Sequence, residues 1–323
     1  MKTAFITGIA GQDGSYLSEY LLDLGYRVCG IIRRNSTVEH QRNRITHLEL
    51  ELEYGDLTDQ SSLERALRLF NPDEIYNLAS QSHVRISSDL PQYTAQVNAL
   101  GVLNLLEAYK LICPKAKFYQ ASSSEMFGNS LEDDSFQRES TKFKPVSPYG
   151  CSKVFAFNIV HHYRSAYNLH ASNGILFNHE SPRRGANFVT NKVVKGAVEI
   201  KLKLQKNLEL GNLDSYRDWG HSKDYVRAMH LILQKNKADD YVVATGESRS
   251  VRDMCNYVFS KLGLNYLEFV IQNEKFMRPE ELPYLRGDAT RIKNELGWQP
   301  EYNFEKLMDE MIEFWLNFYK SKV

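Results

Sequence analysis

The first half of the chain alternates short apolar runs with longer segments whose apolar residues recur at helical spacing. The strand-like runs are TAFIT, RVCGII, LELEYGD, EIYNLAS and KFYQASS, and the helical segments are Tyr16–Leu24, SLERALRLF and Asn98–Leu111. Alternation of this kind is typical of the βαβ units of a parallel sheet. The pattern predicts about five or six such units, and therefore a doubly wound parallel α/β sheet of the Rossmann type.

After about residue 175 the pattern loosens into polar loops punctuated by glycine and proline, such as SPRRG, GNLDSYRDWG and MRPEELPYLRG. Loops of this kind between helices favour a smaller second lobe that binds a substrate. Val242–Gly246 again resembles a strand, so we expect the chain to return to the sheet around residues 220–250. The predicted division is a sheet domain over residues 1–175 and a smaller C-terminal lobe over residues 176–323.

Charge and composition narrow the range of partners. The 40 basic and 40 acidic residues cancel, so an anionic ligand needs a local cluster of cations, and we expect binding to neither nucleic acid nor membrane. No stretch approaches the ~20 apolar residues of a membrane span, and the chain opens on a strand pattern, which predicts a cytoplasmic protein. The scattered cysteines predict no disulfide and no metal site: Cys29, Cys113, Cys151 and Cys255.

The first predicted strand ends in a glycine-rich turn with Gly8, Gly11 and Gly14, and a helix follows at once. Glycine lets the backbone approach a pyrophosphate, and the helix N-terminus offers unpaired N–H groups with a partial positive charge. Glycines at such turns often have only a steric role, and the spacing is GxxGxxG in place of the commoner GxGxxG. Their position in the first βα unit nevertheless favours a dinucleotide site.

The second predicted strand ends in Arg33 and Arg34, where an enzyme that uses NAD would usually have Asp or Glu against the ribose hydroxyls. Two guanidinium groups could instead bind a 2′-phosphate through charge-assisted hydrogen bonds. A pair of arginines is often just a solvated basic loop. Its location at the end of the strand favours NADP as the cofactor.

Tyr149 and Lys153 form a YxxxK pair after Pro148, which predicts that both side chains lie on one face of a helix. The lysine ammonium would lower the pKa of the phenol and make it a base for a substrate hydroxyl. Upstream, serines and Glu125 follow the KFYQASS strand, at the sheet edge where doubly wound folds bind ligands. A serine run alone would be an ordinary loop, but beside the Tyr–Lys pair it predicts part of a catalytic site.

These motifs together resemble the extended short-chain dehydrogenase/reductase family. Longer strings over nearly the whole chain resemble the GDP-mannose 4,6-dehydratases within it: GQDGSYL, YNLASQSHV, YQASSSEMFG, NGILFNHESPRRG, FVTNK, RDWG and DYVVATG. The resemblance implies a homo-oligomer, dimer or tetramer, that uses NADP to convert GDP-mannose into GDP-4-keto-6-deoxymannose. This is a hydro-lyase reaction of deoxysugar biosynthesis.

In that family a Thr or Ser, a Glu, a Tyr and a Lys cooperate, and the resemblance assigns these roles to Ser123, Glu125, Tyr149 and Lys153. Tyr149 would take the proton of the sugar 4-hydroxyl as hydride passes from C4 to NADP, and Ser123 would hydrogen-bond the developing oxygen. Glu125 would take the C5 proton and protonate the departing 6-hydroxyl, after which hydride returns to C6 and a proton to C5. A simple reductase needs no such carboxylate, so Glu125 is the residue that indicates dehydration.

The resemblance also implies which residues bind the two ligands. The implied cofactor-binding residues are Gly8, Gly11, Gln12, Asp13, Gly14, Arg33, Arg34, Ser36, Asp56, Leu57, Leu78, Ala79, Ser82, Tyr93, Lys153, His179 and Arg184. The implied substrate-binding residues are Asn178, Lys192, Arg217, Arg278 and Glu281. These cations suit a diphosphate and the carboxylate suits the guanine edge, although Arg217 and Arg278 could also be solvated loop arginines.

Two departures from the family pattern leave alternatives open. The segment from Arg34 to Leu52 is shorter than the family's extended loop, which contributes to tetramer contacts and to cofactor binding across subunits. Asn191 stands where the family usually has arginine, which removes a charge near the expected sugar-nucleotide site. The alternatives are a GDP-manno-heptose 4,6-dehydratase, a GDP-sugar 4-reductase or epimerase, and a regulatory NADP-binding protein without catalysis.

Overall fold

Seven parallel strands form the central sheet in the computed structural model, which describes residues 1–34 and 43–321. Their order across the sheet is β10-β6-β5-β4-β1-β2-β3, and every neighbouring pair is parallel. This confirms the predicted doubly wound α/β sheet. The strands are β1 (Thr3–Thr7), β2 (Arg27–Ile32), β3 (Glu51–Tyr54), β4 (Glu74–Asn77), β5 (Lys117–Ser123), β6 (Ala171–Leu176) and β10 (Asp240–Val243).

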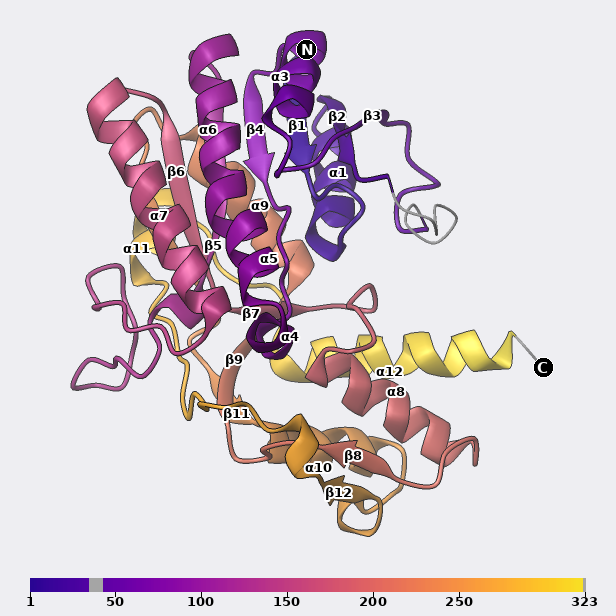
Figure 1. The fold of residues 1–323 in the computed structure, drawn as a ribbon. Helices are drawn as coiled ribbons and strands as arrows, with labels where there is room; N and C mark the ends of the chain where they lie inside the picture. The colour runs from indigo at the N-terminus through magenta and orange to yellow at the C-terminus, as the bar shows by residue number, and fades with distance from the viewer. Residues whose placement is uncertain (35–42, 322–323) are drawn as a thin grey trace.

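Helices cover both faces of the sheet, and alternate residues of each strand point to opposite faces (Figure 1). In β1, Phe5 packs into the core beneath one helix layer, whereas Ala4 and Ile6 pack into the core beneath the other. The first layer contains α3 (Gln60–Phe70), α6 (Gly101–Ile112) and α7 (Pro148–Tyr167). The second contains α1 (Gln12–Asp23), α9 (Ser222–Gln234) and α11 (Thr290–Leu296).

A smaller lobe lies below the carboxyl ends of the central strands in the view of Figure 1. It has its own apolar core, to which Val194, Met254 and Met308 contribute. Its helices are α8 (Val189–Lys201), α10 (Val251–Lys261) and α12 (Phe304–Lys320), and β8 (Leu208–Leu210) pairs with β12 (Val270–Gln272). A three-stranded sheet of β7 (Asn178–Glu180), β9 (Tyr216–His221) and β11 (Ser248–Ser250) completes the described strands.

The observed starts of two helices differ from the starts that the apolar pattern predicts. Helix α1 begins at Gln12, ahead of the predicted start at Tyr16, because its first turn consists of polar residues and glycine that pack against the glycine turn. A π-helical turn (Gln96–Leu100) precedes α6, after α4 (Val84–Asp89) and α5 (Pro91–Ala95). Short 3₁₀ turns cover Ser124–Met126, Tyr266–Glu268 and Glu274–Phe276.

The cysteines are free thiols, and Cys151 is the exposed one among them. Within residues 1–34 and 43–321, no helix combines the length and apolarity needed to cross a membrane.

Candidate active site

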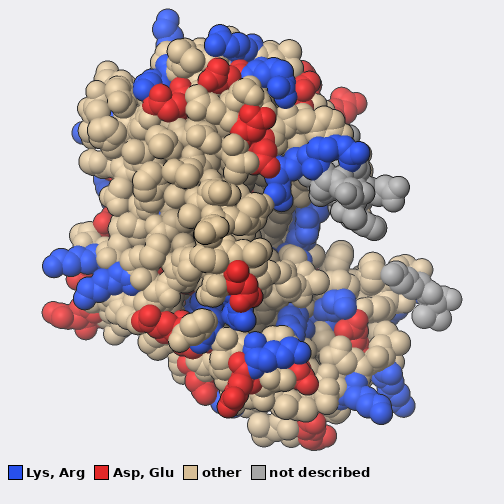
Figure 2. Space-filling model, in the orientation of Figure 1, with Lys and Arg blue, Asp and Glu red and all other residues tan. Residues whose placement is uncertain are grey.

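A cavity of about 670 Å³ lies between the carboxyl edge of the central sheet and the smaller lobe. Lys and Arg side chains gather at this boundary on the face shown in Figure 2. All of the predicted catalytic residues line the cavity: Ser123, Glu125, Tyr149 and Lys153. Every predicted substrate residue lines it as well: Asn178, Lys192, Arg217, Arg278 and Glu281.

The glycine turn has the geometry that a dinucleotide requires. Gly8 has a φ of +70°, and a Cβ there would lie 2.8 Å from the backbone nitrogen of Ala79. A Cβ on Gly14 would lie 2.3 Å from the carbonyl oxygen of Gly8. Gly11 is the N-cap of α1 and has no side chain to cap the first N–H groups of the helix. The turn therefore needs its glycines and presents these N–H groups to an anion.

Local sequence explains how the catalytic side chains are held. Ser123 is the last residue of β5, and its Oγ accepts a hydrogen bond from the backbone N–H of Glu125 at 3.2 Å. Ser147 caps α7, and Pro148 occupies the first turn, where a missing N–H costs nothing. Tyr149 and Lys153 follow one turn apart and are both buried.

The structure corrects the expected effect of Lys153 on Tyr149. The Lys153 Nζ donates to the carbonyl oxygen of Ala121 at 2.8 Å and lies 5.7 Å from the centre of the Tyr149 ring. Burial raises the pKa of Tyr149 to about 12, although a hydrogen bond with Ser123 opposes the shift. Burial also lowers the pKa of Lys153 to about 8. Desolvation therefore outweighs any lowering by Lys153, and the prediction that the pKa of the phenol falls toward neutral pH is wrong for the protein alone.

Glu125 pairs with one of the predicted substrate residues. The Arg278 Nη1 lies 3.2 Å from Glu125 Oε1, and the Arg278 backbone N–H donates to Glu281 Oε1 at 3.1 Å. Burial opposes the charge on Arg278, but Glu125 and Glu281 raise its pKa overall. Arg217 is also buried, donates to the carbonyl oxygens of Tyr216 and Leu282 at 2.8 Å, and is thus no solvated loop arginine.

Strand β7, which follows β6 in the chain, contacts the start of α1 through polar side chains. His179 Nδ1 donates to the carbonyl oxygen of Phe177 at 2.7 Å, and Nε2 lies 2.8 Å from Asp13 Oδ2. Burial works against a charged His179, but Asp13 raises its pKa; the same pairing lowers the pKa of Asp13 despite burial. Gln12 Nε2 donates to the carbonyl oxygen of His179 at 3.2 Å. Gln12 and Asp13 therefore link the glycine turn to the cavity wall.

The remaining predicted cofactor residues lie along the carboxyl edge of the sheet. Arg33 Nη1 donates to the hydroxyl of Tyr93 at 2.6 Å, so the structure brings these two residues together. The carboxylate of Asp56 accepts from the backbone and hydroxyl of Thr58, and Leu57 is buried. The cavity lining includes Leu78, Ser82 and Arg184, and Arg184 pairs with Glu180 at 2.9 Å. Ser36 lies outside the described residues.

Sequence reasoning missed several residues that line the cavity, namely His83, Arg85, Asn187, Phe188 and Phe276. Some of these residues lie in or near the strings SHV and SPRRG, but no chemical motif identified them as site residues. Asn191, where the family usually has arginine, contacts other residues behind the cavity lining. It is buried, donates to the Arg184 carbonyl oxygen and accepts from Trp315 Nε1, both at 2.6 Å. It therefore secures the cavity wall and does not line the cavity.

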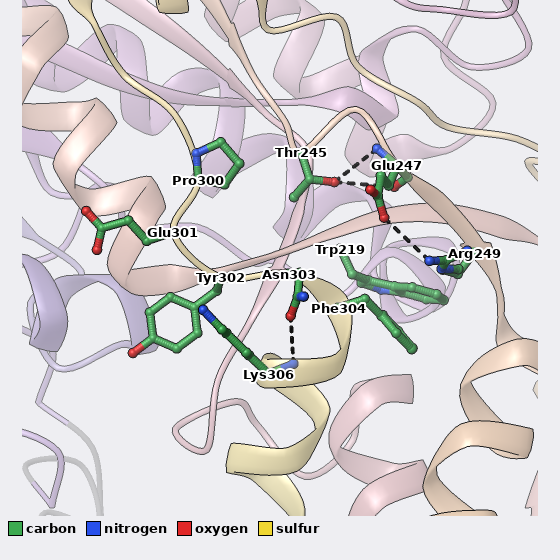
Figure 3. Close-up of a pocket in the computed structure, with 10 residues that line it drawn as sticks. All are labelled: Trp219, Thr245, Glu247, Arg249, Pro300, Glu301, Tyr302, Asn303, Phe304 and Lys306. Atoms are coloured by element: carbon green, nitrogen blue, oxygen red, sulfur yellow. Dashed lines mark hydrogen bonds and ion pairs between the residues drawn. The ribbon is translucent and has the colours of Figure 1, made fainter.

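A second, smaller cavity of about 180 Å³ lies beside β9 (Figure 3). Trp219 lines both cavities and packs near Phe304 at the start of α12. None of the predicted site residues is among the described residues that line this second cavity. The chemistry is therefore expected in the larger one.

Comparison with known proteins agrees with this geometry. A family described as "GDP-mannose 4,6 dehydratase" matches residues 5–311. This chain belongs to that family. GDP-mannose 4,6 dehydratase 1 of Arabidopsis thaliana is 49% identical to it, over 97% of this chain and 89% of that protein. The GDP-mannose 4,6 dehydratase of Homo sapiens is 47% identical, over 96% of this chain and 90% of that protein.

Solved structures show the same fold. A dTDP-glucose 4,6-dehydratase from Bacillus anthracis in complex with NAD superposes with a TM-score of 0.85 at 23% identity, over 99% of this chain and 98% of that chain. A Pseudomonas aeruginosa protein titled RMD, complexed with NADPH, gives a TM-score of 0.81 at 24% identity, over 98% and 100% of the two chains. At these identities the two structures establish the fold alone.

Proposed function

We propose that this chain converts GDP-mannose into GDP-4-keto-6-deoxymannose by 4,6-dehydration, as a hydro-lyase of deoxysugar biosynthesis. The observation that carries the proposal is Glu125 lining the same cavity as Tyr149 and Lys153, opposite a group of cations. Membership of the GDP-mannose 4,6 dehydratase family supports the substrate. The comparisons do not favour the GDP-manno-heptose, reductase or epimerase alternatives, nor a protein without catalysis.

The cofactor is a nicotinamide dinucleotide, and we propose NADP. The glycine turn fits the pyrophosphate because Gly8, Gly11 and Gly14 leave backbone N–H groups accessible. Arg33, at the end of β2, fits a 2′-phosphate. We propose that Lys153, His179 and Arg184, which line the cavity, lie on the nicotinamide side of the cofactor. When bound, the nicotinamide accepts hydride from the substrate and returns it, so that no net oxidation occurs.

The chain's own residues would move the protons. Tyr149 takes the proton of the sugar 4-hydroxyl, and Ser123, whose Oγ also contacts the Glu125 N–H, hydrogen-bonds the same oxygen as it becomes a ketone. The ketone acidifies the C5–H bond. Glu125 takes that proton and passes it to the departing 6-hydroxyl, which leaves as water. When the hydride returns to C6, a proton returns to C5, which balances the one that Tyr149 took from the 4-hydroxyl.

Each of the two parts of the chain is proposed to bind mainly one of the two ligands. We propose that residues 1–175 mainly bind NADP and that residues 176–323 mainly bind the GDP-sugar, with Lys192, Arg217 and Arg278 facing the diphosphate. We also propose a cytoplasmic homo-oligomer, either a dimer or a tetramer.

The direct test is to incubate the purified protein with GDP-mannose and a catalytic amount of NADP, and to follow the product by mass spectrometry. Loss of one water per substrate without accumulation of NADPH supports the proposal. Accumulation of NADPH in proportion to product, or no turnover of GDP-mannose, would contradict it.

Arg33→Gln is expected to reduce the affinity for NADP by about 10- to 100-fold, since charge-assisted hydrogen bonds to a phosphate contribute about 1.5–3 kcal/mol. The affinity for NAD should change little, because NAD has no 2′-phosphate. Equilibrium binding of both cofactors measures the ratio. Tyr93→Phe separates the charge of Arg33 from its positioning, since it removes the hydrogen bond to Arg33 but keeps the charge. Equal losses for NAD and NADP would contradict the role of Arg33.

Lys153→Met is expected to slow dehydration about 10²-fold at pH 7, because the positive charge that favours the tyrosinate is lost. Since the pKa of Lys153 is about 8, the wild-type residue is charged below that pH and neutral above it. The ratio of wild-type to variant rate should therefore shrink above about pH 8. A kcat profile against pH measures it, with Lys153→Arg as the control that stays charged. A constant ratio would exclude a charge effect.

A further inference from the structure

The ion pair between Arg278 and Glu125 joins the two parts of the molecule across the cavity. Glu125 follows β5 at the sheet edge, whereas Arg278 follows the 3₁₀ turn Glu274–Phe276 of the smaller lobe. The Glu125 side chain is 7% exposed and that of Arg278 is 27% exposed. The proposed base for C5 is thus buried and is held by a residue from the proposed substrate-binding lobe.

The pairing geometry leaves room for a competitor. Both contacts to Glu125, at 3.2 Å and 3.5 Å, come from the single nitrogen Nη1 of Arg278. The strongest guanidinium pairs instead use two nitrogens in a fork, and phosphate oxygens match that fork as well as a carboxylate does. A diphosphate that engages the fork of Arg278 can therefore displace a carboxylate held through one nitrogen.

The surrounding charges also favour a diphosphate. Burial, together with the nearby charge of Arg278, lowers the pKa of Arg217 to about 10. Two guanidinium groups are thus held close enough to repel each other, with Glu125 and Glu281 as the compensating anions. Lys192 adds a third cation to the same cavity. A dianionic group between these cations relieves more repulsion than Glu125 alone can.

We propose that the diphosphate of the substrate takes Arg278 away from Glu125, so that Glu125 becomes a free base only when a nucleotide diphosphate is bound. This rests on the proposed dehydration of a GDP-sugar. A buried carboxylate that loses its cation accepts a proton more readily, which is what removal of the C5 proton requires. Arg278 is then a specificity-determining residue: sugars without the diphosphate leave the base paired.

Binding of GDP and of guanosine, measured by calorimetry on the intact chain, tests the exchange. If GDP must break the ion pair, Glu125→Gln should bind GDP about tenfold more tightly than the wild type, because Arg278 is already free. Guanosine lacks the diphosphate and should bind both proteins equally. Arg278→Gln should bind GDP more weakly, and adding Glu125→Gln to it should bring no further tightening.

The double variant separates exchange from a general charge effect. Removing a negative charge near the diphosphate would tighten GDP binding with or without Arg278, whereas exchange requires Arg278. Equal tightening in both backgrounds, or none in either, would overturn the exchange. A crystal structure with GDP should show Arg278 on the diphosphate and beyond ion-pair distance from Glu125, and a retained pair would also overturn it.

The proposed function and the exchange fail in different ways. If GDP binds as expected but GDP-mannose is not dehydrated, the function is wrong and the exchange stands. If GDP-mannose is dehydrated but Glu125→Gln does not tighten GDP binding, the exchange is wrong and the function stands. If the wild type binds no GDP, both are wrong.

Discussion

Replacing Glu125 by glutamine is expected to slow the loss of water from GDP-mannose by at least about 10³-fold while leaving the binding of NADP unchanged. The amide keeps the size of the buried side chain but cannot accept the C5 proton. The first step should persist, because Tyr149 and Lys153 remain in place. We therefore expect one equivalent of reduced cofactor to form in a single turnover, with almost no dehydrated product by mass spectrometry.

The matched control is Glu64→Gln on α3, where the same chemical change affects a partly exposed carboxylate that does not line the cavity. It should leave both the reduced-cofactor signal and the water loss at wild-type levels. Normal dehydration by Glu125→Gln would transfer the role of the C5 base to another residue. Loss of the reduced cofactor as well would place Glu125 in the first step.

The central sheet could be predicted from sequence because its strands are short and, except for the edge strand β3, mostly buried on both faces. TAFIT, RVCGII and KFYQASS coincide with β1, β2 and β5 residue for residue. The start of α1 could not be found in the same way. Its first turn contributes backbone and polar contacts to the glycine turn, and apolar periodicity carries no information about these.

The types of residue in the site could also be predicted from the sequence, but not which side chains contact one another. Glu125 and Arg278 are 153 positions apart in the chain, and no local pattern indicates that they meet. The effect of Lys153 on Tyr149 was predicted from charge alone, whereas burial dominates in the folded chain. The contacts of Asn191 could not be predicted for a similar reason, since its place between Arg184 and Trp315 depends on the packing of α12.

Tyr149→Phe is expected to slow both cofactor reduction and water loss by about 10³- to 10⁴-fold, because no proton leaves the 4-hydroxyl without the phenol oxygen. The ring is 8% exposed, so phenylalanine preserves the packing. In the protein alone burial holds the pKa of Tyr149 at about 12, and the phenol is therefore protonated at neutral pH. Its action as a base therefore requires a lower pKa in the substrate complex than in the protein alone. Single-turnover absorbance of the reduced nicotinamide measures the first step directly.

Tyr163→Phe is the matched control, since Tyr163 is also buried on α7 but its hydroxyl bonds Glu107, away from the cavity. That variant should lose about 1 kcal/mol of stability and keep its rate. Together with Glu125→Gln, Tyr149→Phe shows the order of the two steps. Tyr149→Phe should form almost no reduced cofactor, whereas Glu125→Gln should form reduced cofactor without losing water. Reduced cofactor formed at the wild-type rate by Tyr149→Phe would mean that another group removes the hydroxyl proton, and the cavity residue to examine next would be Ser123.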